Sequence, residues 1–358
     1  VKSLNILKKH NIARIVKLKA ATEVPLLIIM EYIEGQNLQT FKESRLCEDW
    51  ETILKIVIQV SEVLMSAHSL PERVLHRDLR PTNIMLPFKR SCDDIKIVLC
   101  DFDFSWHKDA IEDSINRSPN GYLAPEQADK SYRASTRSAQ VDSFALGMNI
   151  LYLVSGKHPE FKMHLQRDWE AHIKYGCKSI KECGWYSIPT RIERAIFQLT
   201  QDDQNSRWDI SQIYLEAKRL LECIQNNKSG YAELIAEELM ARIIGDVEYS
   251  IVRNGFEYKY KNGLNIGLYY DEIKMEIKFG IKYVTDGTQT YSNIKKYLSP
   301  KREHTKAQLT RLGWSTDMDE HEKESFNIIF FINAKRVSDN IDSMAKEMKS
   351  IKTEYNFN

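Results

Sequence analysis

The chain has 358 residues, enough for about two domains at a typical size of ~150 residues each. Its 51 Lys and Arg residues balance 50 Asp and Glu residues, so net charge does not favour binding to nucleic acid or to acidic lipid. Apolar residues make up 42% of the chain, which is enough to build packed cores and argues against a disordered protein.

No segment of the sequence has the features of a membrane span or a secretion signal. The longest nearly continuous apolar run covers residues 24–30, far short of the ~20 residues that cross a bilayer. The first residues show no charged region with a small-residue cleavage site. The six cysteines form no Cys-x-x-Cys pair, so we expect reduced thiols in a cytoplasmic protein that does not engage a membrane.

The first part of the chain is expected to be mainly helical after two initial strands. Residues 1–20 predict the end of a helix and then a strand, and the apolar residues 25–32 predict a buried strand. Apolar side chains recur at helical spacing in residues 50–69. The same spacing predicts further helices over residues 141–155, 190–200 and 209–225.

A polar run at residues 225–230 has the composition of a linker and marks the expected domain boundary. We therefore expect one domain over residues 1–226 and a second over residues 227–358. The second domain begins with a predicted amphipathic helix over residues 231–244.

The rest of the second domain predicts strands and a final helix. Clean alternation over residues 272–283, with Ile273 and Met275 on the apolar side, predicts a half-buried antiparallel strand. Strands are also expected in residues 247–260, 264–270 and 326–333, and a last helix over residues 337–352. Short turns between the first three strands predict an antiparallel meander within an α+β module.

The segment HRDLRPTN at residues 76–83 holds the residue types that phosphoryl transfer from ATP to a hydroxyl requires. Asp78 can orient the acceptor hydroxyl and take its proton. Arg80 can pair with γ-phosphate oxygens, and Asn83 can bind a metal ion through its amide oxygen. One loop thus offers a base, a cation and a metal ligand.

A second acidic segment, DFD at residues 101–103, directly follows an apolar run at residues 95–100. A carboxylate at the end of a buried strand is suited to bind Mg²⁺, so Asp101 is a candidate metal ligand. The tripeptide APE at residues 124–126 and a helical segment that carries Asp142 come next.

Taken together and in this order, these segments resemble the eukaryotic-type protein kinase family, in particular its C-terminal lobe. HRDLRPTN is similar to the family's HRD-x-K-P-x-N catalytic loop, DFD occupies the place of DFG, and APE matches without change. The resemblance implies a mainly α kinase large lobe of protein kinase-like α+β fold over residues 1–226. The smaller α+β domain with its antiparallel meander would follow it.

The resemblance also implies ATP and Mg²⁺ as cofactors and assigns residues to them. The segment MEYIEG at residues 30–35 looks like the hinge, so Glu31 and Ile33 would offer backbone groups to adenine and Met85 would form its floor. Asn83 and Asp101 would then bind Mg²⁺. Core packing alone also accounts for Met85.

Two structural pairings follow from the same resemblance. Asp142 matches the aspartate that braces the catalytic loop from a central helix. Arg207 is placed to pair with Glu126, although a solvated arginine is the alternative.

The sequence departs from the family pattern at several places. Asp103 replaces the glycine of DFG, and Arg80 replaces lysine, which keeps the charge but changes its geometry. No glycine-rich loop and no strand lysine occur in the chain, which starts at Val1. We therefore expect a longer parent protein and weak or absent activity for this chain alone.

Two readings of the function follow. The first is an ATP- and Mg²⁺-dependent protein kinase that transfers the γ-phosphate to Ser or Thr hydroxyls of a protein substrate. The alternative is a pseudokinase scaffold, in which residues 227–358 recruit a partner. A basic stretch within residues 291–314, near Trp314, could touch nucleic acid, but such runs are usually solvated helix faces and nucleic acid is not expected as a partner.

Overall fold

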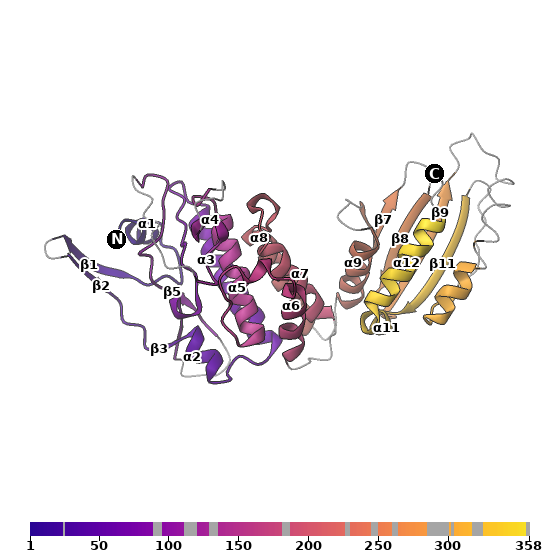
Figure 1. Ribbon diagram of the computed structural model, residues 1–358, viewed down its shortest axis with the longest axis horizontal. Coiled ribbons are helices and arrows are strands. Elements are labelled where there is room, and N and C mark those ends of the chain that lie inside the picture. The colour runs from indigo at the N-terminus through magenta and orange to yellow at the C-terminus, as the bar shows by residue number, and fades with distance from the viewer. Residues whose placement is uncertain are drawn as a thin grey trace. The chain divides into compact units, whose positions relative to one another are not determined.

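A computed structural model describes the chain in two compact units, residues 1–225 (unit 1) and residues 226–358 (unit 2). The residues that the structure describes are 1–23, 26–88, 95–110, 120–128, 135–180, 187–225, 230–244, 250–259, 264–284, 301, 304–316 and 325–355. Figure 1 shows the elements of each unit, which are treated separately below.

Unit 1 begins with a helix and an antiparallel hairpin. Helix α1 (Lys2–Lys9) is followed by β1 (Leu18–Glu23) and β2 (Leu26–Met30), which pair with each other in a two-stranded sheet. The prediction of a buried strand at residues 25–32 was wrong in its burial, since Leu27 is 50% and Ile29 47% exposed. Among the described residues β2 pairs with β1 alone, and the sheet stays two-stranded with Leu27 and Ile29 open to solvent.

Helices make up most of the rest of unit 1 (Figure 1). They are α2 (Leu38–Glu43), α3 (Trp50–His68), α4 (Pro125–Ala128), α5 (Gln140–Ser155), α6 (Trp169–Ser179), α7 (Ser187–Leu199) and α8 (Ile210–Gln225). The predictions for α3, α5, α7 and α8 are confirmed, whereas α2 and α6 were not predicted. Every residue from 141 to 154 is buried, so α5 is the central helix against which α3, α6, α7 and α8 pack.

A small sheet in unit 1 positions the segments that hold the candidate site residues. Strands β3 (Gly35–Asn37), β4 (Ile84–Pro87) and β5 (Val98–Leu99) pair antiparallel in that order. A Cβ on Gly35 would lie 2.2 Å from the Leu86 carbonyl oxygen, so this strand crossing requires glycine. Because β4 follows Asn83 directly and β5 ends just before Asp101, the sheet brings the two predicted site segments to neighbouring positions.

Unit 2 is built on a six-stranded antiparallel sheet in the order β10-β11-β9-β8-β7-β6. The strands are β6 (Ser250–Val252), β7 (Gly255–Lys259), β8 (Leu264–Asp271), β9 (Glu276–Val284), β10 (Ser315–Thr316) and β11 (Ser325–Asn333). The expected meander is present as β6 to β9, and β11 adds next to β9.

One face of this sheet is apolar and is covered by helices (Figure 1). The register pairs Leu268 with Phe279 and Ile266 with Ile281, and all four side chains are at most 2% exposed. Helix α9 (Tyr231–Ile244) packs on β7 and β8, and α11 (Ala334–Asp339) and α12 (Ile341–Tyr355) pack against α9. The helix predicted over residues 231–244 is confirmed.

Three expectations for unit 2 were wrong. Strand β9 begins at Glu276, because residues 272–275 form a turn in which Met275 has φ 53° and Ile273 is 97% exposed. The last helix is divided at Asn340, whose side chain donates to the Arg336 carbonyl in competition with the helix. The strand expected over residues 247–260 is instead two strands, β6 and β7, which pair with each other. Trp314, at the end of the basic stretch, is 2% exposed and its ring centroid lies 6.2 Å from that of Phe279, so it belongs to the core, in keeping with the expectation that nucleic acid is not a partner.

Much of the basic stretch at residues 291–314 falls outside the described residues. Among the helices that the structure does describe, none combines the length and the apolar character needed to cross a bilayer.

Candidate active site

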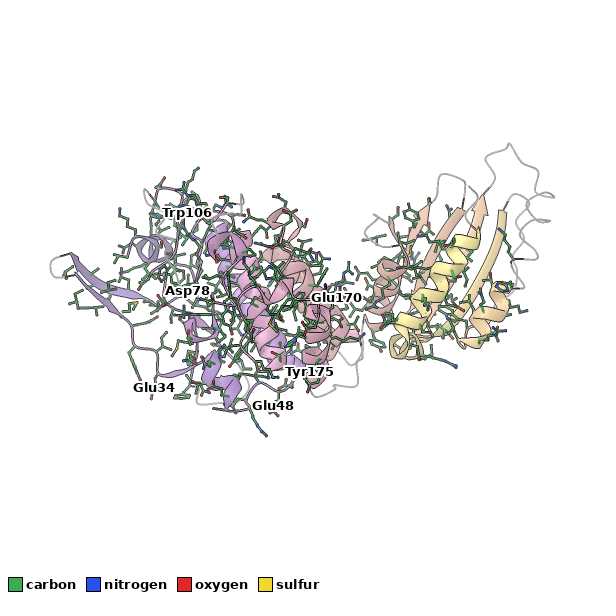
Figure 2. The ribbon with its side chains drawn as sticks, in the orientation of Figure 1. Glu34, Glu48, Asp78, Trp106, Glu170 and Tyr175 are labelled. Atoms are coloured by element: carbon green, nitrogen blue, oxygen red, sulfur yellow. The ribbon has the colours of Figure 1, made fainter. Side chains whose placement is uncertain are left out.

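The loop at residues 76–83 is held at both ends by backbone hydrogen bonds. At its start, Leu75 and Trp106 exchange N–H···O bonds of 2.8 and 3.0 Å. At its end, the N–H of Cys100 donates to the Asn83 carbonyl at 2.9 Å. Figure 2 labels Asp78 on this loop. The sequence separation of these partners means that the loop conformation depends on the fold of unit 1.

Asp78 and Asn83 lie side by side. The Asn83 amide donates to the Asp78 carbonyl at 2.9 Å and to its carboxylate Oδ2 at 3.3 Å. Both residues are buried, at 6% and 5% exposed. Because the Asn83 nitrogen is directed at Asp78, its amide oxygen is the acceptor end of the side chain, and it accepts the Thr82 hydroxyl at 3.3 Å.

Asp142 of α5 holds the loop through hydrogen bonds to its backbone. Its two carboxylate oxygens accept the N–H of His76 at 2.9 Å and of Arg77 at 2.7 Å, and His68 Nε2 lies 2.8 Å from Oδ2. Burial opposes ionisation of Asp142, but the bonds from His68 and from the Arg77 N–H outweigh it and hold its pKa below the ordinary value. The ionised brace fixes Arg77 at φ 65°, a backbone conformation that a non-glycine residue rarely adopts.

Asp101 is attached to the same loop through its neighbours. His76 Nε2 lies 3.1 Å from the Cys100 carbonyl, and the His76 and Phe102 rings are 4.6 Å apart. Asp101 itself has φ 61°. The exposed Asp103, at the position of the family's glycine, has no such positive φ, so the backbone there accepts a side chain without strain.

Arg80 lies next to Asp78 and is partly exposed. Its Nε lies 3.7 Å from Asp78 Oδ2, and 42% of its side chain is exposed. This arrangement puts a cation next to the candidate base and accessible from solvent.

The predicted hinge residues follow the hairpin. The Glu31 N–H donates to the Lys17 carbonyl at 2.9 Å, and the Glu31 carboxylate accepts the Lys17 N–H at 2.9 Å. Within the described part of the chain, neither the Glu31 carbonyl nor the Ile33 N–H has a protein hydrogen-bond partner. Met85 lies on β4 opposite Asn37 and Val98.

Glu126 and Arg207 form a buried bidentate ion pair. The guanidinium Nη1 and Nη2 lie 2.6 and 2.9 Å from the two Glu126 oxygens, and both side chains are 0% exposed. Gln204 adds a donor to Glu126 at 2.7 Å. The pairing expected for Arg207 is therefore present, and the alternative of a solvated arginine is wrong.

Sequence reasoning missed three residues that hold these segments together. The Gln127 amide donates to the Arg77 carbonyl at 3.0 Å, the Asn149 amide to the Leu79 carbonyl at 3.0 Å, and Gln204 contacts Glu126 as above. Asn149 alone had a visible signal, since it is an amide in the otherwise apolar stretch 144–154.

Cys100 is expected to be a slow nucleophile despite its place next to Asp101. Burial, followed by the charges of Asp101 and Glu31, raises the pKa of its thiol to about 11, so the thiolate is scarce at pH 8. We expect iodoacetamide at pH 8 to alkylate Cys100 at least ~10-fold more slowly than glutathione, as measured by peptide mass spectrometry. Alkylation at the rate of glutathione would contradict this environment.

Comparison with known proteins identifies the class that this fold and site define. The family model described as the protein kinase domain matches residues 1–248, more than half of the chain. The chain therefore belongs to the protein kinase family, and the fold of unit 1 is protein kinase-like.

Similar proteins include several serine/threonine kinases. The Arabidopsis thaliana probable LRR receptor-like serine/threonine-protein kinase RPK1 is 28% identical over 174 residues, 46% of this chain and 30% of that protein. Serine/threonine-protein kinase pkn3 of Myxococcus xanthus is 31% identical over 169 residues, which are 44% of this chain and 29% of that protein. Serine/threonine-protein kinase PrkC of Bacillus subtilis (strain 168) is 24% identical over 257 residues, which are 66% of this chain and 37% of that protein.

These matches span about a third of the length of those relatives. Among solved structures, the crystal structure of Rad53 kinase domain and SCD2 matches with a TM-score of 0.42 and 23% identity, over 59% of this chain and 74% of that chain.

Proposed function

We propose that this chain transfers the γ-phosphate of ATP to Ser or Thr hydroxyls of a protein, with Mg²⁺ as the metal ion. The rate is low but measurable, because the chain contains neither a glycine-rich loop nor a strand lysine to hold the phosphates. The observation that carries the proposal is the contact of Asp78 with Asn83, with the backbone just before Asp101 hydrogen-bonded to the same Asn83. Phosphoryl transfer depends on positioning and electrostatic stabilisation, and this cluster supplies groups for both.

Each residue of the cluster has a role that its surroundings support. Asp78 orients the acceptor hydroxyl and accepts its proton, since its carboxylate is buried next to an amide donor and a guanidinium. Arg80 pairs with γ-phosphate oxygens from its half-exposed position. Bound Mg²⁺ neutralises charge on the phosphates when present.

The donor set fits Mg²⁺. Asn83 presents its amide oxygen, and Asp101 adds a carboxylate at the end of β5. Within the residues that the structure describes, no group of three His, Cys, Asp or Glu side chains could hold a metal ion on its own. Mg²⁺ is commonly bound by only one or two protein carboxylates together with substrate phosphates, so two oxygen ligands are sufficient here.

The hinge residues support adenine binding in the same proposal. Glu31 offers its carbonyl and Ile33 its N–H, because neither group is engaged by another described residue. Met85 on β4 would lie under the base with its flexible thioether.

The partners and compartment follow from the same proposal. A Ser/Thr protein substrate is in keeping with the class of the similar kinases. Unit 2 would serve as a regulatory or partner-binding module. Cys47, Cys100, Cys177 and Cys223 are free thiols, which supports a reducing compartment such as the cytoplasm.

Nucleotide binding tests the proposal directly. At 100-fold excess over its Kd, ATP with Mg²⁺ is expected to stabilise the folded chain by about 2.7 kcal/mol, measured as a shift of the thermal unfolding midpoint. Asp101→Asn should remove most of the Mg²⁺-dependent part of this shift. Asp109→Asn, which changes an exposed carboxylate in the same loop, should retain it. The absence of any shift with the unmodified chain would argue against a nucleotide site.

The pseudokinase scaffold is the second candidate, and Asp103 is the observation that favours it. This carboxylate is exposed next to Asp101, where it would repel phosphates. On this reading ATP binding is weak and Asp103→Gly strengthens it, whereas the kinase proposal requires measurable phosphoryl transfer with Asp103 in place.

A further inference from the structure

Helix α5 carries two polar side chains that reach the loop at residues 76–83. Asp142 and Asn149 are seven positions apart, which corresponds to about two helical turns and places them on the same side of the helix. Asp142 is 0% and Asn149 1% exposed. The contact of Asn149 with Leu79 was described above, but Asn149 has no part in the proposed reaction so far.

The Asn149 amide is directed at the catalytic loop. Its Nδ2 donates to the Leu79 carbonyl at 3.0 Å, and to the Ala145 carbonyl one turn back at 2.7 Å. Its Oδ1 is buried and has no hydrogen-bond partner among the described residues. Both donor hydrogens are therefore used while the acceptor is not.

This arrangement does not favour stability of the helix core. A buried amide oxygen without a partner is unfavourable, and a leucine, which is larger but branches at the same carbon, would bury no polar atom in this helix. The gain from Asn149 lies in its bond to Leu79, the residue that directly follows the candidate base.

We infer that Asn149 is a positioning residue that, together with Asp142, holds Asp78 in place. Asp142 binds the N–H of Arg77, and Asn149 binds the carbonyl of Leu79. Asp78 lies between these two anchored residues, so the direction of its carboxylate is fixed by one rigid helix from both sides. The inference rests on the proposed kinase function for its catalytic consequence, whereas the anchoring itself can be measured independently.

Asn149→Leu in the full chain tests the inference, with Met148→Leu on the same buried helix as the control. In Asn149→Leu, amide hydrogen exchange of the peptide that covers residues 76–80 should rise about fivefold or more, and by more than that of the other peptides of unit 1. The kcat of phosphoryl transfer should fall about tenfold, with the KM for ATP within twofold of the unmodified chain. Met148→Leu should change neither exchange nor kcat.

Asn149→Gln, which retains an amide donor, should recover part of the protection. Unchanged exchange at residues 76–80 in Asn149→Leu would overturn the inference whether or not the chain is active. If the unmodified chain transfers no phosphate, the proposed function fails and exchange alone decides the role of Asn149. If Asn149→Leu increased hydrogen exchange at residues 76–80 but left kcat unchanged, the inference that Asn149 positions Asp78 would be overturned.

Discussion

Replacing Asp78 with asparagine is expected to lower kcat for phosphoryl transfer by ~10²–10⁴-fold, the usual contribution of a general base. Asparagine keeps the shape of the side chain and can still contact Asn83, so the fold and the hinge are preserved. The stabilisation of the chain by ATP and Mg²⁺ should therefore remain. Transfer of radiolabelled phosphate to a generic Ser/Thr-containing protein, together with a thermal shift, measures both quantities.

Asp168→Asn is the matched control, because it removes an aspartate whose side chain is 68% exposed. It should leave both kcat and the thermal shift unchanged. If Asp78→Asn retained the full rate of transfer, the role given to this carboxylate would be wrong. Loss of the thermal shift in Asp78→Asn would instead indicate that Asp78 is needed for nucleotide binding.

Removing one partner of the Glu126–Arg207 pair should be strongly destabilising. In Glu126→Gln the Arg207 guanidinium stays buried without its carboxylate, and breaking such a pair costs about 3–5 kcal/mol. The neighbouring Phe144 ring, 5.1 Å from the guanidinium carbon, replaces only a small part of this interaction. Urea unfolding of the full chain, followed by tryptophan fluorescence, measures the change in free energy of unfolding.

An exposed pair provides the comparison. Lys55 and Glu51 lie 2.8 Å apart on α3, with 30% and 41% of their side chains exposed. Lys55→Ala should change the free energy of unfolding by less than about 1 kcal/mol, because solvent screens this pair. Equal effects of Glu126→Gln and Lys55→Ala would show that burial of the Glu126–Arg207 pair contributes little to stability.

Helix α5 connects these predictions. Asp142 and Asn149 anchor the loop around Asp78, and Arg207 donates to the carbonyl of Gln140 at the start of the same helix at 3.4 Å. A change in the packing of α5 would thus reach the candidate base and the segment that carries Glu126 together. A buried helix is well suited to this function, since its position is fixed by packing on several sides.

The local features of the site could be read from the sequence. Asp78 and Asn83 are five residues apart on one loop, so their contact needs only a tight local turn that ends in the 3₁₀ segment Pro81–Asn83. The long helices were equally readable, because their apolar side chains repeat at a period that depends on the helix alone. The chemistry of Asp78, Arg80 and Asn83 likewise follows from their residue types.

Features that depend on distant partners could not be read in the same way. The exposure of β2, the early end of the alternating pattern at Ile273 and the burial of Trp314 depend on which surfaces other elements cover. The contacts of Gln127 and Asn149 join positions 50 and 70 residues apart. Amides are common on solvated surfaces, and no local pattern distinguishes one that will meet a buried carbonyl.

The sequence by itself therefore determined the family, the main helices and the residues that we propose for phosphoryl transfer, because periodicity and side-chain chemistry are local properties. The tertiary structure decided how Asp78 is held, since buried polar groups must find partners and those partners come from α5 and α4. Hydrogen-bond satisfaction in the interior is a property of the packed chain as a whole.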